Sequence, residues 1–113
     1  MNDINWAGEL GVAITVSDTT GKIVYMNDRS ATTFARYGGR DLEGKNLRDC
    51  HLPVSWDKIL EIMNSGRANC YTIDKEGVRK LIYQAPWHHN GEIAGLVELS
   101  MEIPLIINHF VRE

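Results

Sequence analysis

The chain has 113 residues, of which 43% are hydrophobic and 24% charged, and its formal net charge is −3. This length suits one domain, and the apolar content is that of a folded protein rather than a disordered one. The mild acidity gives no electrostatic basis for binding nucleic acid, and no apolar run approaches the roughly 20 residues that a membrane-spanning helix needs. Because the N-terminus lacks a basic stretch followed by an apolar one, we expect a cytoplasmic protein.

The first part of the chain predicts a β-hairpin followed by a helix. Residues 12–17 alternate in the period of a strand, with their larger apolar side chains on one face. A turn over residues 18–21, ending in glycine, leads to a second strand over residues 22–26. Asn27 or Asp28 is suited to cap the helix that follows, because either side chain accepts hydrogen bonds from free backbone N–H groups.

The second half predicts another helix and three more strands. Pro53 and Ser55 introduce a helix that extends to about Ser65. Asn90-Gly91 is a strong hairpin signal, since both residues tolerate a positive φ. Tight turns between the last strands favour an α+β fold, with a five-stranded antiparallel sheet and helices packed on one face. The last three strands are expected over residues 68–73, 78–88 and 92–101, with a hairpin loop over residues 74–77.

This order of strands, turns and helices resembles the PAS sensor fold over roughly residues 9 to 102. The likeness is carried by the Asp-x-x-Gly turn between two strands, the asparagine that opens the first helix, and the final hairpin. The stretches that carry it are residues 16–27, Leu42-Glu43-Gly44-Lys45, and Asn90-Gly91-Glu92-Ile93-Ala94-Gly95. We therefore expect an N-terminal flanking segment over residues 1–10, a PAS domain over residues 11–102, and a C-terminal linker or signalling segment over residues 103–113.

A narrower likeness involves the segment before the second predicted helix. Asp49-Cys50-His51-Leu52-Pro53, followed by Lys58-Ile59-Leu60-Glu61-Ile62, is similar to a PAS subgroup with a Cys-His-Pro-Pro step, often found beside hemerythrin-like domains. Leu52 stands where that subgroup has its first proline.

The resemblance implies a sensory and dimerisation module rather than an enzyme. PAS domains hold a small ligand between sheet and helices, or hold none, and relay a ligand- or redox-dependent change to an output partner. A ligand-free protein-interaction domain is the alternative. We expect the pocket between the sheet and residues 50–63, lined by aromatic rings and polar groups. The candidate ligand-binding residues are Phe34, Tyr37, Cys50, His51, Trp56, Tyr71 and Tyr83.

The sequence does not identify a cofactor. Flavin is disfavoured, because Leu47 follows Gly44-Lys45-Asn46 where flavin photoreceptors of this fold have a reactive cysteine. Covalent haem would need Cys-x-x-Cys-His, which is absent. A haem-based gas or redox sensor with His51 or the Cys50 thiolate on the iron is an alternative to Cys50 packing in the core and His51 capping a helix. His88 and His89 point to opposite faces of a strand, so no metal site is expected there.

Both ends of the chain are apolar. Leu105, Ile106 and Phe110 lie in the C-terminal segment, and Trp6 and Leu10 lie near the start. Exposed apolar patches of this kind usually mark an interface, and two-fold homodimers are the commonest assembly. We therefore expect a homodimer through the chain ends, the alternative being that the C-terminal segment packs on its own sheet.

Overall fold

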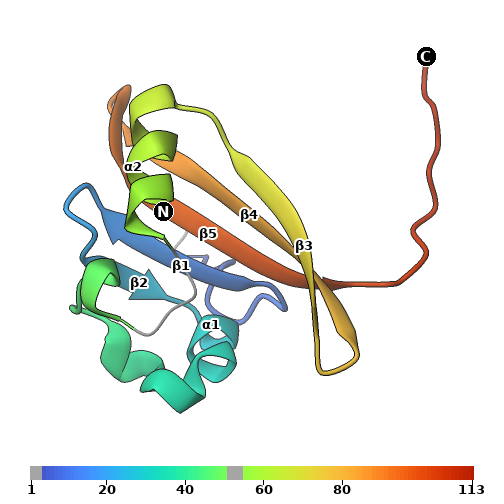
Figure 1. Cartoon of the computed structure of the whole chain (residues 1–113), viewed down its shortest axis with the longest axis horizontal. Coiled ribbons are helices and arrows are strands. Elements are labelled where there is room, and N and C mark those ends of the chain that lie inside the picture. The colour runs from blue at the N-terminus through green and yellow to red at the C-terminus, as the bar shows by residue number, and fades with distance from the viewer. Residues whose placement is uncertain (1–3, 51–54) are drawn as a thin grey trace.

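The computed structural model of the chain describes residues 4–50 and 55–113. Five strands form one sheet in the order β2-β1-β5-β4-β3, and every neighbouring pair is antiparallel (Figure 1). The predicted α+β fold with a five-stranded antiparallel sheet is thereby confirmed. The strands are β1 (Ala13–Asp18), β2 (Ile23–Met26), β3 (Asn69–Lys75), β4 (Val78–His89) and β5 (Glu92–Ile103).

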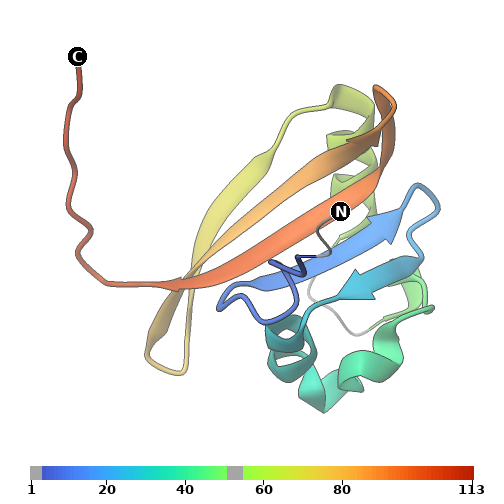
Figure 2. The same cartoon turned by 180° about the vertical axis from the view of Figure 1, so that it is seen from behind.

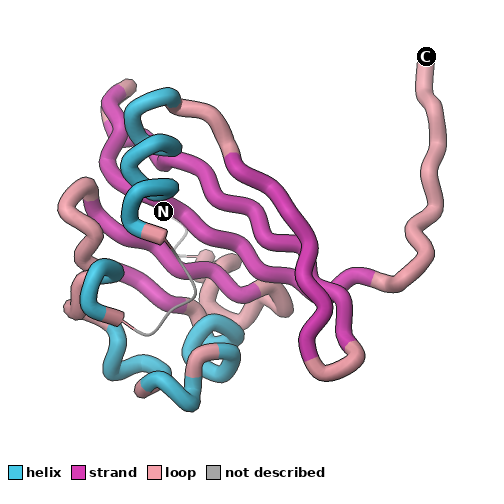
Figure 3. The backbone as a smooth tube through the Cα atoms, in the orientation of Figure 1, coloured by secondary structure: helices cyan, strands magenta, loops and turns pink. Residues whose placement is uncertain are grey.

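In the described part of the connection between the second and third strands lie two α-helices, α1 (Asp28–Thr33) and α2 (Trp56–Ser65), and three short 3₁₀ turns (Figure 3). Helix α1 ends at Thr33 and gives way to a 3₁₀ turn over Ala35–Tyr37. Helix α2 crosses one face of the sheet beside β4 and β5, and the segment before β1 lies on the other face (Figure 2). Within the described residues, neither helix has the length and apolarity to cross a bilayer.

Two tight turns fix the registers of β3, β4 and β5. Asn90 and Gly91 both have positive φ, and His89 pairs with Glu92, so the predicted two-residue hairpin is confirmed. Lys75 pairs with Val78, which makes the preceding hairpin loop two residues long rather than the four expected. Strand β3 is longer than predicted because Asp74 and Lys75 still pair with β4. Asp74 also forms an ion pair with Arg79 there.

The two faces of the sheet differ in polarity. Thr15 faces the helices, because its hydroxyl lies 2.6 Å from that of Ser30 in α1. Side chains alternate along a strand, so Ile14 and Val16 face away from the helices. The register carries this assignment across the sheet. The side away from the helices holds Val97, Leu99 and Met101 of β5 with Leu81 and Tyr83 of β4, and the helix-facing side holds Gln84, Ile82, Leu96, Glu98 and Ser100.

The hydrophobic core lies between the helix-facing side of the sheet and the helical segments. Ile59 and Ile62 of α2 are almost fully buried there, as are Ile23 and Met26 of β2. The other buried members of this core are Phe34, Leu42, Leu47 and Leu96. Helix α2 covers only one end of the sheet (Figure 1). A cavity opens on the helix-facing side beyond it, next to the end of α1.

Candidate functional site

A cavity of about 210 Å³ opens on the helix-facing side of the sheet, between the end of α1 and strands β3, β4 and β5. Phe34, which directly follows α1, forms part of its wall and also belongs to the core. The cavity therefore lies at the border of the core, where a ligand would touch both layers. Its lining residues are Thr33, Phe34, Tyr71, Ile73, Lys75, Lys80, Ile82, Glu98 and Ser100.

A row of polar side chains crosses the sheet at one end of this cavity. Asn69, Gln84 and Glu98 lie directly opposite one another on β3, β4 and β5. Asn69 Nδ2 donates to Gln84 Oε1 at 2.9 Å, and Gln84 Nε2 donates to Glu98 Oε1 at 2.8 Å. These two hydrogen bonds fix the orientation of the Gln84 amide, so that it presents a donor to the Glu98 carboxyl.

Glu98 is the buried ionisable group of the cavity. Its side chain is only 9% exposed, and Oε1 accepts the one hydrogen bond that the carboxyl makes with the described residues. Burial raises the pKa of this carboxyl, and the hydrogen bond from Gln84 offsets only part of that effect. A buried carboxyl with unused acceptor capacity is a group that a ligand can satisfy.

Tyr71 and two lysines complete the polar lining. Burial and, to a lesser degree, the charge of Glu98 raise the pKa of the Tyr71 hydroxyl, which therefore remains a hydrogen-bond donor at neutral pH. Lys75 is exposed at the end of β3, and Lys80 is half-buried on β4. Neither lysine forms an ion pair with another described residue. The cavity thus has an acidic end at Glu98 and a basic end at the lysines.

The predicted site residues are distributed over three places. Phe34 and Tyr71 line the cavity. Tyr37, Cys50 and Trp56 pack partly buried against the hydrophobic core, and none of the three is part of the cavity lining.

The remaining two predicted residues, Tyr83 and His51, are not among the described lining residues of the cavity. Tyr83 lies on the opposite side of the sheet, since its neighbours Ile82 and Gln84 face the helices. His51 lies outside the described residues. Contact of any of the seven with a ligand stays a prediction.

The described part of this site offers no suitable axial ligand for haem iron. The cavity lining contains no histidine, cysteine or methionine, and burial raises the pKa of the Tyr71 hydroxyl, which opposes the tyrosinate form that would bind haem iron. Burial raises the pKa of the Cys50 thiol, which opposes the thiolate form that iron binds. The described residues of the cavity therefore do not fit haem. Elsewhere in residues 4–50 and 55–113, no three histidine, cysteine or acidic side chains are gathered in a way that could hold a metal ion.

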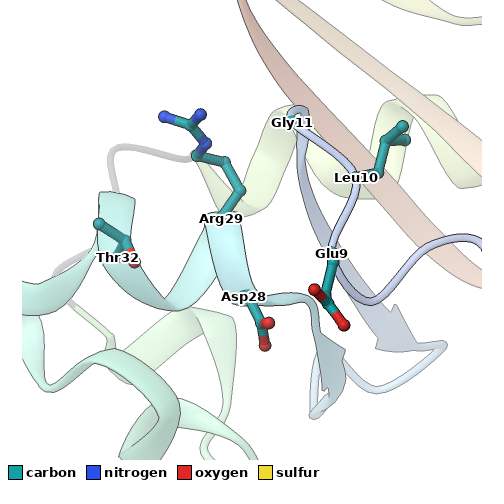
Figure 4. Close-up of a pocket in the computed structure, with 6 residues that line it drawn as sticks. All are labelled: Glu9, Leu10, Gly11, Asp28, Arg29 and Thr32. Carbon is teal, nitrogen blue, oxygen red and sulfur yellow. The ribbon is translucent and has the colours of Figure 1, made fainter.

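A second depression lies between the segment before β1 and helix α1 (Figure 4). Its lining is formed by Glu9, Leu10, Gly11, Asp28, Arg29 and Thr32, all of which are exposed. Glu9 and Asp28 point to the same side in Figure 4, whereas Arg29 points away from them. Asp28 is already paired with Arg40 at 2.8 Å. This depression is lined by exposed residues and has no buried polar group, so we place the candidate site in the cavity beside Glu98.

Apart from Tyr71, sequence reasoning did not single out the polar residues of the cavity. Glu98 and Ser100 alternate with apolar residues of β5, a pattern typical of the solvated side of a strand. The Asn90-Gly91 turn gives an approximate pairing of β4 with β5, but a bulge after Trp87 shifts that pairing by one residue. Gln84 lies directly opposite Glu98 only because of this one-residue shift.

No protein-family model and no curated protein matches the chain. Solved structures do. The chain is similar to the PAS domain of a protein from Colwellia psychrerythraea, with a TM-score of 0.58 and 18% identity over 85% of this chain and 89% of that one. It is similar to a sensory box sensor histidine kinase from Vibrio cholerae, with a TM-score of 0.59 and 15% identity over 85% of both chains.

A third similar structure is that of VqmA from Vibrio cholerae, a LuxR-type receptor solved as a dimer without its target DNA and also as a complex with ligand and DNA. The dimer structure gives a TM-score of 0.65 and 16% identity over 94% of this chain, which spans about half (54%) of the VqmA chain. At these identities the likeness establishes the architecture. The chain has the PAS fold.

Proposed function

We propose that the chain is a sensory module that binds a small ligand in the cavity beside Glu98 and passes the change to an output partner through β5 and the C-terminal segment. The observation that carries this proposal is the buried Glu98 carboxyl, which lines a cavity and uses only one of its oxygens in a hydrogen bond to the described residues. Buried polar groups of this kind are normally satisfied, so their presence in a cavity favours a ligand.

Strand β5 connects the cavity to the end of the chain. Glu98 and Ser100 line the cavity, and the strand continues to Ile103, where the C-terminal segment leaves the sheet (Figure 1). β5 pairs with β1 on one side and β4 on the other, so a shift at Glu98 acts on the centre of the sheet. The structural likeness to a sensor histidine kinase and to a ligand-binding receptor is consistent with this role.

The test is whether the folded protein retains a small molecule in this cavity. Native mass spectrometry of protein incubated with a bacterial metabolite extract, followed by denaturation, would give the bound mass. Ser100→Phe fills the cavity from β5, whereas Met101→Phe places the same ring on the opposite side of the sheet as a control. We expect a bound compound in the wild type and in Met101→Phe but not in Ser100→Phe. A wild type with no bound compound would favour the ligand-free interaction domain, and retention in Ser100→Phe would mean that the compound binds elsewhere than in this cavity.

We also propose that two copies associate through the chain ends. Trp6, Leu105, Ile106 and Phe110 are 68–86% exposed, and the C-terminal segment does not pack on its own sheet (Figures 1 and 2). The apolar side of the sheet that faces away from the helices adjoins this segment, because β5 leads directly into it. Together they form an apolar surface that a second copy could cover.

A further inference from the structure

The cavity carries opposite charges at its two ends. Glu98 lies in the row of the sheet that includes Gln84, and Lys80 lies four residues from Gln84 on the same strand. At about 3.3 Å per residue, these two positions on β4 are separated by roughly 13 Å along the strand. Lys75 lies at the end of β3, beyond the residue that pairs with Lys80. Because these side chains face the same cavity, a ligand between them meets an acid at one end and two cations at the other.

The Glu98 carboxyl has no positive partner within the protein as described. Gln84 supplies a neutral amide donor, and its own oxygen is held by Asn69. The hydroxyl of Tyr71 is neutral, and the lysines belong to the other end of the lining. An unpaired buried carboxylate is costly, and a charge-assisted hydrogen bond from a protonated amine is the strongest way to stabilise it.

Apolar side chains line the stretch between the two charged ends. Ile73 of β3 and Ile82 of β4 come from the sheet, and Phe34 comes from the end of α1. A methylene chain would bury its surface against these residues, which stabilises binding by roughly 25 cal/mol per Å². At about 30 Å³ of liquid volume per water molecule, a cavity of 210 Å³ holds on the order of seven water-sized groups.

We propose that the cavity binds a small ω-amino acid, with its ammonium group at Glu98, its methylene chain against Ile73 and Ile82, and its carboxylate at Lys75 and Lys80. This assignment rests on the proposed sensory function and names the class of ligand for that site. The four-residue offset between Gln84 and Lys80 requires the two charged groups of the ligand to be separated by several bonds. An α-amino acid, in which both groups share one carbon, does not reach both ends.

A matched series of five-carbon compounds tests the charge pattern by isothermal titration calorimetry. The probes are 5-aminopentanoate, 1,5-diaminopentane and pentanedioate, which share one length and differ only in their end groups. We expect 5-aminopentanoate to bind at least about tenfold more tightly than either of the others, since each lost charge pair is worth on the order of tenfold. Equal or tighter binding of the diamine or the diacid would overturn the proposal, as would no binding of any of the three.

Two substitutions identify the groups responsible. Glu98→Gln retains the acceptor for Gln84 and removes the charge, and Lys80→Gln removes a cation from the other end. Each should weaken 5-aminopentanoate by about tenfold or more. Glu92→Gln and Lys22→Gln change exposed residues that lie outside the cavity lining and do not pair with a lining residue, and they should leave the affinity unchanged. A far-ultraviolet circular dichroism melt of each variant shows that it is folded, and unchanged affinity in a folded Glu98→Gln protein would refute the role of Glu98.

Failure of this inference is distinguishable from failure of the proposed function. If the retained compound found by mass spectrometry lacks either an amine or an acid, and is lost in Ser100→Phe, the sensory function stands and the ω-amino acid assignment is wrong. If no compound is retained and none of the three probes binds, both are wrong.

Discussion

A single buried amide, that of Asn27, ties three segments of the chain together. Its Oδ1 accepts hydrogen bonds from the backbone N–H groups of Ile14 and Ser30, both at 2.9 Å. Its Nδ2 donates to the carbonyl oxygens of Ala7 and Val12. One side chain therefore caps α1 and holds both β1 and the segment before it. The sequence identified the cap, because the residue type and position are local, but not the long-range bonds.

Asn27→Ala should lower the free energy of unfolding by about 3 kcal/mol or more, because it removes a helix cap and leaves several buried backbone groups without partners. Asn46→Ala is the matched control. Asn46 caps a 3₁₀ turn and donates to the carbonyl of Thr20 near the surface, so its loss should cost about 1 kcal/mol. Urea denaturation of the two variants gives the comparison, and equal losses would contradict the role given to Asn27.

Glu98 makes stability depend on pH. Its pKa is raised in the folded protein, so the folded state favours the protonated carboxyl. The stability that this group contributes is fully present below its pKa in the unfolded chain and is lost as the pH rises through the folded pKa. Glu98→Gln removes this loss, so the melting temperature of the variant relative to the wild type should increase from pH 5 to pH 8. Thermal unfolding across that range measures it, with Glu102→Gln as control; a constant difference would mean that Glu98 does not titrate there.

Strand β1 leaves no room for a side chain at Gly95 of β5. A Cβ atom on this residue would fall on the backbone carbonyl oxygen of Ser17. The same carbonyl accepts a hydrogen bond from the indole Nε1 of Trp87 at 2.9 Å, and Trp87 pairs with Gly95 across β4 and β5. The missing side chain thus lets the tryptophan reach across β5 to β1 and join three strands.

Gly95→Ala should destabilise the protein by about 2 kcal/mol or more, since the methyl group forces β1 away from β5 and residue 95 has a φ of 150° that favours glycine. Gly11→Ala is the control, because no heavy atom beyond its two chain neighbours lies within 4 Å of the corresponding Cβ position. That change should stay within about 0.5 kcal/mol of the wild type. Chemical denaturation followed by tryptophan fluorescence measures both effects, and a wild-type midpoint for Gly95→Ala would show that the strands adjust without cost.

At the level of elements, the sequence predicted the order, the kinds of element and the hairpin turns, because these depend on local periodicity and on residues that tolerate positive φ. It did not predict which side of the sheet the helices cover. Apolar alternation usually marks the covered side. Here Val97, Leu99 and Met101 face away from the helices, and Glu98 and Ser100 face them.

The same reversal explains how much of the candidate site was predictable. Phe34 and Tyr71 were expected near a ligand from their size and position, and both line the cavity. Glu98, Lys75 and Lys80 were not, because charged residues that alternate with apolar ones usually face solvent. Their placement depends on the pairing of β3, β4 and β5 and on the end of α1, which no local pattern encodes.

At the scale of the whole molecule, apolar surface is left uncovered at the chain ends. The C-terminal segment after β5 carries Leu105, Ile106 and Phe110, each at least 68% exposed. The apolar side of the sheet, which includes Leu99 and Tyr83, lies next to the point where this segment begins. A second copy can cover both. A standard interface buries about 1,600 Å² in total, and at roughly 25 cal/mol per Å² its apolar part can outweigh the entropy lost on association.

The prediction is a concentration-dependent dimer that the C-terminal segment holds together. Sedimentation velocity at micromolar concentration should show a species of twice the 12.8 kDa chain mass. Ile106→Asp combined with Phe110→Asp should convert it to the monomer, because a charge inside an apolar interface is costly to desolvate. Asn108→Asp adds a charge to the same segment without removing an apolar side chain and should leave most of the dimer intact. A wild-type monomer, or a double variant that remains dimeric, would place the interface elsewhere or remove it.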